Sequence, residues 1–216
     1  MGDNYASYIT DGLIFQLDGI NRGTNDPKQW VDLIGGKIYT TNSGNDATWG
    51  TNHLICSCQM DCESPNLYPE ISSGYTLEVV FECNNSNNQY VYQNKEYQQS
   101  TRQCFAPCLG KYGQNWLLSN WNNSTKGRTS IPFTSMGIGT NIISVTTYPT
   151  KGVYVNGASK TYGGVDFYYA VSNKSYLGSF TGKLYAIRMY NKVLTQAEIL
   201  NNQRVDNKRF NLGLTL

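Results

Sequence analysis

The sequence has little charge and no long apolar run, and these two absences exclude two classes of partner. Charged residues make up only 15% of the 216 residues, and 17 basic against 15 acidic side chains give a net charge of +2. The basic residues form no run, only a loose group at Arg204, Lys208 and Arg209. We therefore expect no nucleic-acid partner. No stretch approaches the roughly 18 apolar residues of a membrane span, so we expect no membrane partner either.

The beginning of the sequence lacks the marks of a secretory signal. MGDNYASYITDG has neither a basic start nor an apolar core. Yet Asn, Gly, Tyr, Ser and Thr are abundant while Glu, Lys, Leu and Ala are sparse, which is typical of strand-rich and turn-rich proteins that work outside cells. We expect a virion-surface or extracellular location, with no signal peptide in this chain. Removal of a signal, another secretion route and release in a particle by lysis stay open as explanations.

Catalytic motifs are scarce as well. The one histidine, His53, has no motif around it, and no G-x-S-x-G sequence is present. Glu78 and Glu82 share one face of an expected strand, where they would lie about 13 Å apart at ~3.3 Å per residue. Glycosidase pairs lie ~5.5 Å or ~6.5–9.5 Å apart. We interpret both as solvated strand carboxylates and predict that the protein is not an enzyme, with a glycoside hydrolase as an alternative.

What the sequence does have is a series of short strands separated by turns. The stretches that we expect as strands are 12–19, 37–41, 52–57, 75–83, 89–93, 115–120, 141–148, 152–157, 174–180 and 183–190. Asn156-Gly157 is a strong hairpin signal, because a type I′ turn needs positive φ at both central residues. This pattern predicts an all-β, antiparallel sandwich. We expect long loops at 57–73 and 94–135, which are rich in Cys, Asn and Gln.

The clearest junction in the sequence joins a strand to a helix. The 183–190 stretch alternates, and we expect Leu184, Ala186, Arg188 and Tyr190 on one face and Tyr185, Ile187 and Met189 on the other. Only Arg188 and Lys183 carry charge there, so both faces look covered, as in an inner strand. Thr195 and Glu198 have the spacing of a capping box. We predict one short helix that begins near Thr195 and lies across the edge of the sandwich.

Several of these segments together carry a resemblance to a known family. DGLIFQLDGINRG, YTLEVVFE, GVYVNG and LGSFTGKLYAIRMYNKVLTQAEILNNQ are similar to the laminin-G-like branch of the concanavalin A-like lectin/glucanase superfamily. Similar proteins occur in gut bacteria and in the tails, fibres and head surfaces of their phages. The resemblance implies one domain over residues 1–216, a jelly-roll sandwich of two antiparallel sheets that is often used to bind glycans.

Glycan binding would use aromatic rings against sugar faces and amides for the hydroxyl groups. The 111–128 stretch, KYGQNWLLSNWNNSTKGR, combines the two. The candidate residues are Tyr112, Trp116, Asn120, Trp121 and Asn122. Trp116 also reads as a core residue, because it precedes an apolar pair, and we interpret Trp30 and Trp49 as core or turn anchors.

Metal and cysteine chemistry leave alternatives open. The resemblance implies calcium as a candidate cofactor, with Asp18, Asn21 and Asp26 as oxygen ligands; alternatively, Asp18 caps its own Asp-Gly turn. The six cysteines are Cys56, Cys58, Cys62, Cys83, Cys104 and Cys108. They are compatible with buried thiols, with disulfides, or with a zinc site made by the 58/62 and 104/108 pairs.

These observations favour a non-catalytic adhesion or glycan-binding module at a surface, as a component of a phage virion. A purely structural capsid or tail decoration protein is the alternative. The expected partner is a glycan or a host-surface receptor. Other virion proteins are further candidate partners, and a homo-oligomer is compatible with the sequence.

Overall fold

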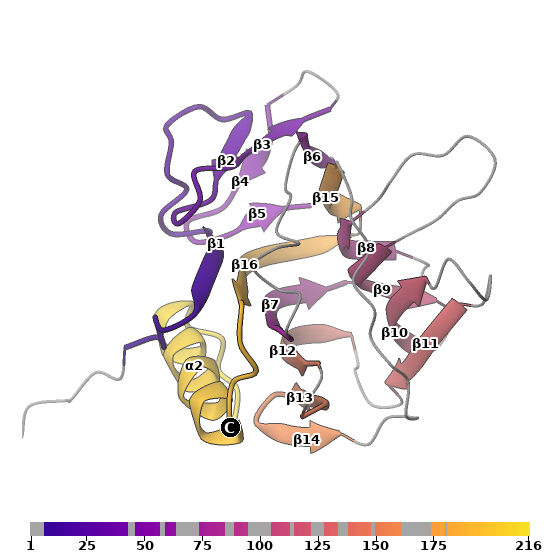
Figure 1. Cartoon of the computed structure of the whole chain (residues 1–216). Coiled ribbons are helices and arrows are strands. Elements are labelled where there is room, and N and C mark those ends of the chain that lie inside the picture. Colours follow the sequence, from indigo (N-terminus) through magenta and orange to yellow (C-terminus); the bar gives the residue numbers. More distant parts are fainter. Residues whose placement is uncertain are drawn as a thin grey trace, which may run out of the picture.

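The structure, a computed structural model, describes residues 7–42, 46–56, 59–63, 74–84, 89–94, 105–112, 115–121, 128–133, 138–147, 150–160, 174–179 and 181–216. Two antiparallel sheets of eight strands each face one another, and a helix near the C-terminus lies against the first sheet (Figure 1). The predicted all-β sandwich with a C-terminal helix is confirmed.

The first sheet has β7 and β16 at its centre. Its strand order is β14-β13-β12-β7-β16-β5-β4, and β1 also pairs with β16. The strands are Leu13–Asp18 (β1), Thr48–Trp49 (β4), Leu54–Ile55 (β5), Thr76–Cys83 (β7), Gly139–Thr146 (β12), Gly152–Val155 (β13), Ala158–Lys160 (β14) and Gly182–Tyr190 (β16). The turn between β13 and β14 has φ of 47° at Asn156 and 81° at Gly157, which confirms the predicted hairpin.

The second sheet has the order β11-β10-β9-β8-β15-β6-β3-β2. Its strands are Gln29–Val31 (β2), Ile38–Thr41 (β3), Met60–Glu63 (β6), Gln89–Asn94 (β8), Phe105–Tyr112 (β9), Asn115–Trp121 (β10), Arg128–Phe133 (β11) and Lys174–Ser179 (β15). The expected long loops are therefore wrong where the structure describes them, since 57–73 contains β6 and 94–135 contains β9 to β11. Ladder pairing uses backbone groups, so polar segments can pair without an apolar alternation.

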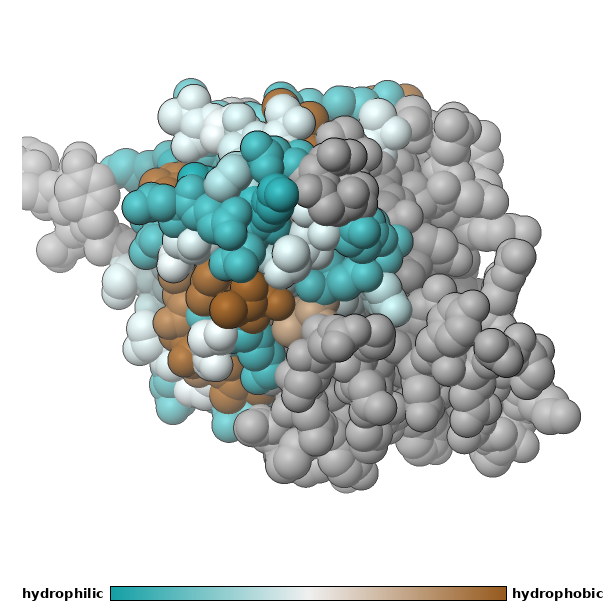
Figure 2. Space-filling view, turned by 90° about the horizontal axis from the view of Figure 1, so that it is seen from above, coloured by the Kyte–Doolittle hydropathy of each residue, from teal (hydrophilic) through white to brown (hydrophobic). Residues whose placement is uncertain are grey.

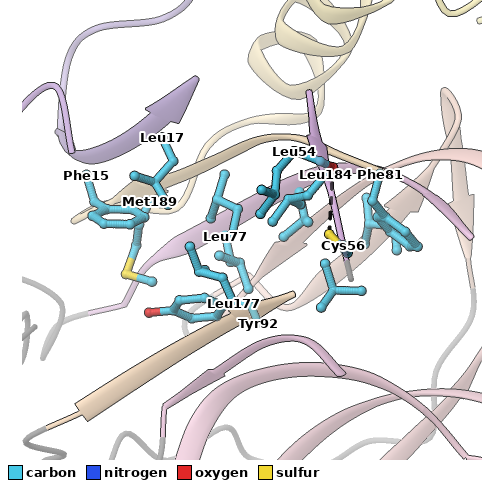
Figure 3. Close-up of a cluster of buried hydrophobic side chains, with 14 of the residues drawn as sticks. Phe15, Leu17, Leu54, Cys56, Leu77, Phe81, Tyr92, Leu177, Leu184 and Met189 are labelled. Atoms are coloured by element: carbon cyan, nitrogen blue, oxygen red, sulfur yellow. Dashed lines mark hydrogen bonds between the residues drawn. The ribbon is translucent and has the colours of Figure 1, made fainter. Parts of the chain in front are cut away.

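The main core lies between the two sheets. Inward side chains of the first sheet, such as Leu77 and Met189, pack against Tyr92 and Leu177 of the second (Figure 3). Trp30 is fully buried in this core and Trp49 is partly buried against it, as predicted for anchoring aromatics. Three of the six cysteines, Cys56, Cys62 and Cys83, are buried there too.

A β-bulge in β16 changes the predicted assignment of faces. The register with β7 shifts between Leu184 and Ala186, so Tyr185 and Ala186 both contribute to the cluster on the outer face with Val80. Leu184 belongs instead to the core between the sheets, with Ile187 and Met189. The expectation that Leu184 shares a face with Ala186 is therefore wrong, because an extra residue in one strand reverses the alternation beyond it. The prediction that β16 is covered on both faces is confirmed.

The helix α2 spans Gln196–Arg209, and its N-cap is the predicted one. Glu198 N donates to Thr195 Oγ1 (3.3 Å), and Thr195 N donates to Glu198 Oε2 (2.7 Å), so the capping box is complete. The helix lies across the outer face of the first sheet rather than across the sandwich edge, on the side away from β8 to β11 (Figure 1). The position on the face follows from polar contacts that a local sequence pattern does not encode.

Among the residues that the structure describes, no helix has the length and apolar character needed to cross a membrane. Among the residues that are coloured in Figure 2, the face seen from above is mostly hydrophilic with a smaller apolar area. The large apolar side chains that are exposed in the described part of the chain are Ile20, Ile34, Ile38, Ile55 and Ile138.

Candidate functional site

The outer face of the first sheet, which α2 covers, carries buried charged and amide side chains that bind one another. Two apolar clusters lie on this face: one around Tyr190, Leu194 and Ile199, the other around Val80 and Phe210. Between them lies a set of buried charged and amide side chains. We call this set the arginine network, because Arg188 is its centre.

Strand register brings the first two members together. Arg188 of β16 is directly opposite Glu78 of β7, so both side chains lie on the same face of the sheet. Arg188 Nε donates to Glu78 Oε2 (3.1 Å), and both side chains are at most 1% exposed. Ser144 of β12, opposite Glu78 on its other side, donates from Oγ to Glu78 Oε1 (3.2 Å).

The helix supplies the second carboxylate and two amides. Arg188 binds Asp206 through two parallel hydrogen bonds, of which Nη1 to Oδ1 is 2.9 Å long. Asn202 lies one turn earlier on the same side of the helix and donates from Nδ2 to Glu78 Oε2 (3.0 Å). Gln203 donates from Nε2 to Ser144 Oγ (3.0 Å). These contacts connect α2 to three neighbouring strands.

The first described residues of the chain close the network from outside. The guanidinium of Arg188 lies over the Tyr8 ring, 4.3 Å from its centroid, and Tyr8 Oη donates to Asp206 Oδ1 (2.8 Å). Ile9 N donates to Asn202 Oδ1 (2.9 Å), and Tyr190 Oη donates to the carbonyl of Ile9 (3.1 Å). We call residues 7–9 the N-terminal strap.

The arginine network is a buried structural assembly. Burial raises the pKa of both Glu78 and Asp206, against the opposing effect of Arg188. Burial acts to lower the pKa of Arg188, but Asp206 and Glu78 outweigh it and hold that pKa above its usual value. The interpretation of Glu78 as a solvated carboxylate is wrong, because its opposite neighbour is an arginine and α2 covers both. A substrate cannot reach Glu78, so Glu78 and Glu82 do not form a glycosidase pair.

A second polar group on the same face remains partly accessible to solvent. Lys183 Nζ donates to Glu82 Oε2 (2.9 Å), and Tyr185 Oη donates to the same oxygen (3.3 Å). The ring of His53, from the turn between β4 and β5, lies 5.3 Å from that of Tyr185. Burial and the Glu82 carboxylate raise the pKa of Tyr185 to about 12, so its hydroxyl stays a donor at neutral pH. Burial, and then Lys183, lower the pKa of His53.

The predicted glycan-binding residues lie in the second sheet. Tyr112 ends β9, whereas Trp116, Asn120 and Trp121 lie in β10. The backbone register pairs Asn115 with Tyr112 of β9 and Trp121 with Arg128 of β11. Asn122 lies outside the described residues. The prediction that these five residues bind a glycan stays a prediction.

The calcium candidates lie in turns whose backbone they cap. Asp18 Oδ1 accepts from the N–H groups of Ile20 (2.8 Å) and Asn21 (3.0 Å), and Arg209 Nη2 donates to Asp18 Oδ2 (2.9 Å). The capping interpretation of Asp18 is confirmed. Asn21 and Asp26 each accept from a backbone N–H two residues later. Calcium binding stays a prediction.

The described part of the chain holds no cluster of three or more His, Cys, Asp or Glu side chains that could bind a metal ion. Cys58 and Cys104 of the predicted zinc set lie outside the described residues, and for Cys108 the structure gives only the backbone position in β9. The choice among thiols, disulfides and zinc therefore stays open.

Two features of this face were missed in the sequence. The charge of Arg188, in a strand predicted to be covered on both faces, was the available signal for a buried counter-charge. His53 had no such signal, because its neighbours Tyr185 and Lys183 come from a strand that lies far away in the sequence.

Comparisons with known proteins identify the class of fold. No family model and no curated protein matches the chain. Trypanosoma rangeli sialidase in complex with sialic acid matches with a TM-score of 0.68 and 14% identity, over 94% of this chain and 34% of that chain. The botulinum neurotoxin type G receptor-binding domain matches with a TM-score of 0.62 and 12% identity, over 91% and 52%.

These likenesses show a β-sandwich that is compatible with a lectin-like, concanavalin A-like fold. The chain spans about a third of the sialidase chain and about half of the toxin domain. The assignment to the laminin-G-like branch stays a prediction.

The comparison also corrects one expectation. We predicted that the protein is not an enzyme, but several of the matching structures are sialidases, which are enzymes. Membership of this fold class therefore gives no support to a non-enzymatic assignment, and that prediction is withdrawn.

Proposed function

We propose that this protein binds a glycan along β9 and β10, at one end of the second sheet. The observation that carries the proposal is the placement of the aromatic and amide residues of 111–112 and 115–121 in two paired strands rather than in a loop. Paired strands hold their positions more rigidly than a loop does, and a rigid site loses less entropy on binding.

The register sets the size of the ligand. Tyr112 is the last residue of β9 and Trp116 lies near the start of β10, whereas Trp121 lies at the opposite end of β10, beside the start of β11. Asn115, which pairs with Tyr112, and Trp121 are six positions apart on the same face of β10, which is about 20 Å at ~3.4 Å per residue, whereas Trp116 and Asn120 belong to the other face. One sugar ring is much shorter than this distance, so the residues suit an oligosaccharide of several sugars.

The known proteins of this fold support a glycan or receptor ligand. The sialidase structure holds sialic acid, and the toxin domain is a receptor-binding domain. Together with the family resemblance, this favours a surface setting. We propose an extracellular or virion-surface location, as a tail, fibre or head-surface component of a phage that contacts a host-surface glycan.

Binding of an oligosaccharide array by the wild type and by the Trp121→Ala and Tyr112→Ala variants tests the proposal. We expect both variants to lose binding while the melting temperature stays nearly unchanged, because a ligand-stacking ring adds affinity without filling the core. Trp30→Ala is the matched control: it removes a fully buried ring and should cost about 3–5 kcal/mol of stability. If Trp121→Ala and Tyr112→Ala unfold the protein as Trp30→Ala does, or if the wild type binds no glycan, the proposed glycan site is wrong. The alternative of a structural capsid or tail decoration protein is then favoured.

A further inference from the structure

The partly exposed polar group on the outer face of the first sheet has the chemistry of a binding site. We infer that Glu82, Lys183 and His53 form a second sugar subsite, separate from β9 and β10, that takes neighbouring hydroxyl groups of a neutral sugar. This inference rests on the proposed glycan-binding function. We call these three residues the outer-face subsite.

Strand pairing makes the subsite rigid. Lys183 of β16 is directly opposite both Glu82 of β7 and Ile55 of β5. The bulge after Leu184 places Tyr185 on the same outer face, where its hydroxyl donates a hydrogen bond to Glu82 Oε2. Bulges often re-aim a side chain beside a functional site. Three strands thus fix the carboxylate and the ammonium group in one place.

Two acceptor atoms of the subsite have no hydrogen-bond donor among the described residues. Glu82 Oε2 accepts two hydrogen bonds, but no described residue donates to Oε1, and the Glu82 side chain is 22% exposed. The other acceptor is on His53. Asn52 Nδ2 donates to the carbonyl of Phe210 (3.0 Å), so Asn52 Oδ1 faces His53 Nδ1 (2.8 Å). An amide oxygen only accepts, so Nδ1 carries the proton and Nε2 of the neutral ring is an acceptor.

The charge of the subsite selects the ligand class. Lys183 and Glu82 cancel one another, and His53 is neutral at pH 7 because its pKa is lowered. A charged ligand would meet a like charge on one of the two ionised groups, whereas a neutral hydroxyl can donate to Glu82 or His53 and accept from Lys183. The exposed side chain of Ile55 beside Lys183 and the imidazole ring offer apolar surface for the C–H groups of a sugar.

Imidazole NMR signals test the inference directly, because His53 is the one histidine in the chain. The probes are the methyl glycosides of glucose, galactose, mannose and N-acetylglucosamine, with glucuronate and glucosamine as charged comparisons. We expect at least one neutral glycoside to shift the His53 ring signals saturably, and the charged sugars to bind more weakly. Glu82→Gln should weaken that binding roughly tenfold or more, because it replaces a charged acceptor.

Two variants complete the test. Asp11→Asn is the matched control, since Asp11 is also a surface carboxylate paired with a lysine, at 2.6 Å from Lys192 Nζ, and we expect it to leave the titration unchanged. Gly50→Ala should also abolish the response, because a β-carbon there would lie 2.3 Å from His53 Nε2 and displace the ring.

The outcomes separate this inference from the proposed function. If the array detects glycans in a Trp121-dependent way while the His53 signals stay fixed for every glycoside, the outer-face subsite is refuted and the proposed function stands. If His53 responds but array binding does not depend on Trp121 or Tyr112, the subsite stands and the β9–β10 site is refuted. If neither method detects any sugar, both proposals are wrong.

Discussion

Arg188 is the residue on which the outer face of the first sheet depends. It lies between two carboxylates, Glu78 and Asp206, and all three side chains are at most 1% exposed. Taking charges out of water costs several kcal/mol per ion, and the mutual attraction of a buried pair offsets this only when the geometry is good and the other polar atoms are satisfied. Ser144, Asn202 and Tyr8 provide that satisfaction.

The surplus negative charge of this network makes the stability of the protein depend on pH. Burial raises the pKa of Glu78 and of Asp206, so the folded protein holds protons that the unfolded chain has released above about pH 4. Their stabilising contribution is complete below the unfolded pKa and is lost as the pH rises through the folded pKa. Glu78→Gln removes one of these groups, so we expect its free energy of unfolding to fall less than that of the wild type between pH 4 and pH 7.

Urea denaturation of both proteins at each pH measures this, and the wild-type-minus-variant difference cancels the groups that the two share. Glu198 is one such group: burial is the largest single effect and acts to raise its pKa, but the capping box and Lys192 together outweigh burial and lower that pKa. Glu198 therefore adds stability as the pH rises. A difference that grows with pH would contradict the buried-carboxylate argument.

At the scale of elements, the end of β16 and the start of α2 differ in how much stability each contributes. Thr195→Ala removes one N-cap hydrogen bond and should cost about 1 kcal/mol. Ile187→Ala removes a fully buried side chain of the core between the sheets and should cost about 2–5 kcal/mol. Urea midpoints rank the two variants. If Thr195→Ala were the more destabilising, the placement of Ile187 in the core would be wrong.

The elements that the sequence predicts are those with a local signal. The capping box at Thr195 and the turn at Asn156-Gly157 each need only a few neighbouring residues, and both are confirmed. The alternation of β7 is confirmed as well, with Leu77, Val79 and Phe81 in the core. The bulge at Tyr185 depends on a partner strand about a hundred residues away in the sequence. The position of α2 depends on contacts with several strands. No local pattern records them.

The candidate sites were predictable to different degrees. The 111–128 stretch stands out by composition, and the structure adds that β9 and β10 contain residues 111–112 and 115–121 of it. Glu82 was visible in the sequence only as half of a glycosidase pair. Its actual partners, Lys183 and Tyr185, come from a strand about a hundred residues later. Strand register assembles the outer-face subsite, and one sequence does not determine the register of distant strands.

At the scale of the whole molecule, the arginine network joins parts that are far apart in the chain. The N-terminal strap, β7, β12, β16 and α2 all contribute hydrogen bonds to it. The other face of β7 and β16 belongs to the core between the sheets. The helix and the strap therefore pack on one face of β7 and β16, and the second sheet packs on the other face. None of these parts can separate without exposing one face of the two strands.

This shared centre predicts that the chain unfolds as one cooperative unit, as expected for a single domain over 1–216. Tryptophan fluorescence follows Trp30 and Trp49 at the core and the two tryptophans of β10, and far-UV circular dichroism follows the strands and the helix. The two signals should give coincident urea transitions. Arg188→Met leaves Glu78 and Asp206 buried without their counter-charge, so it should lower stability by about 3–5 kcal/mol and shift both transitions equally.

Lys183→Met is the control, because its pair with Glu82 is partly exposed and should contribute at most about 1 kcal/mol. If the dichroism transition of Arg188→Met came first while the fluorescence transition stayed in place, α2 and the strap would be an independently unfolding layer, and the single-domain prediction would be wrong.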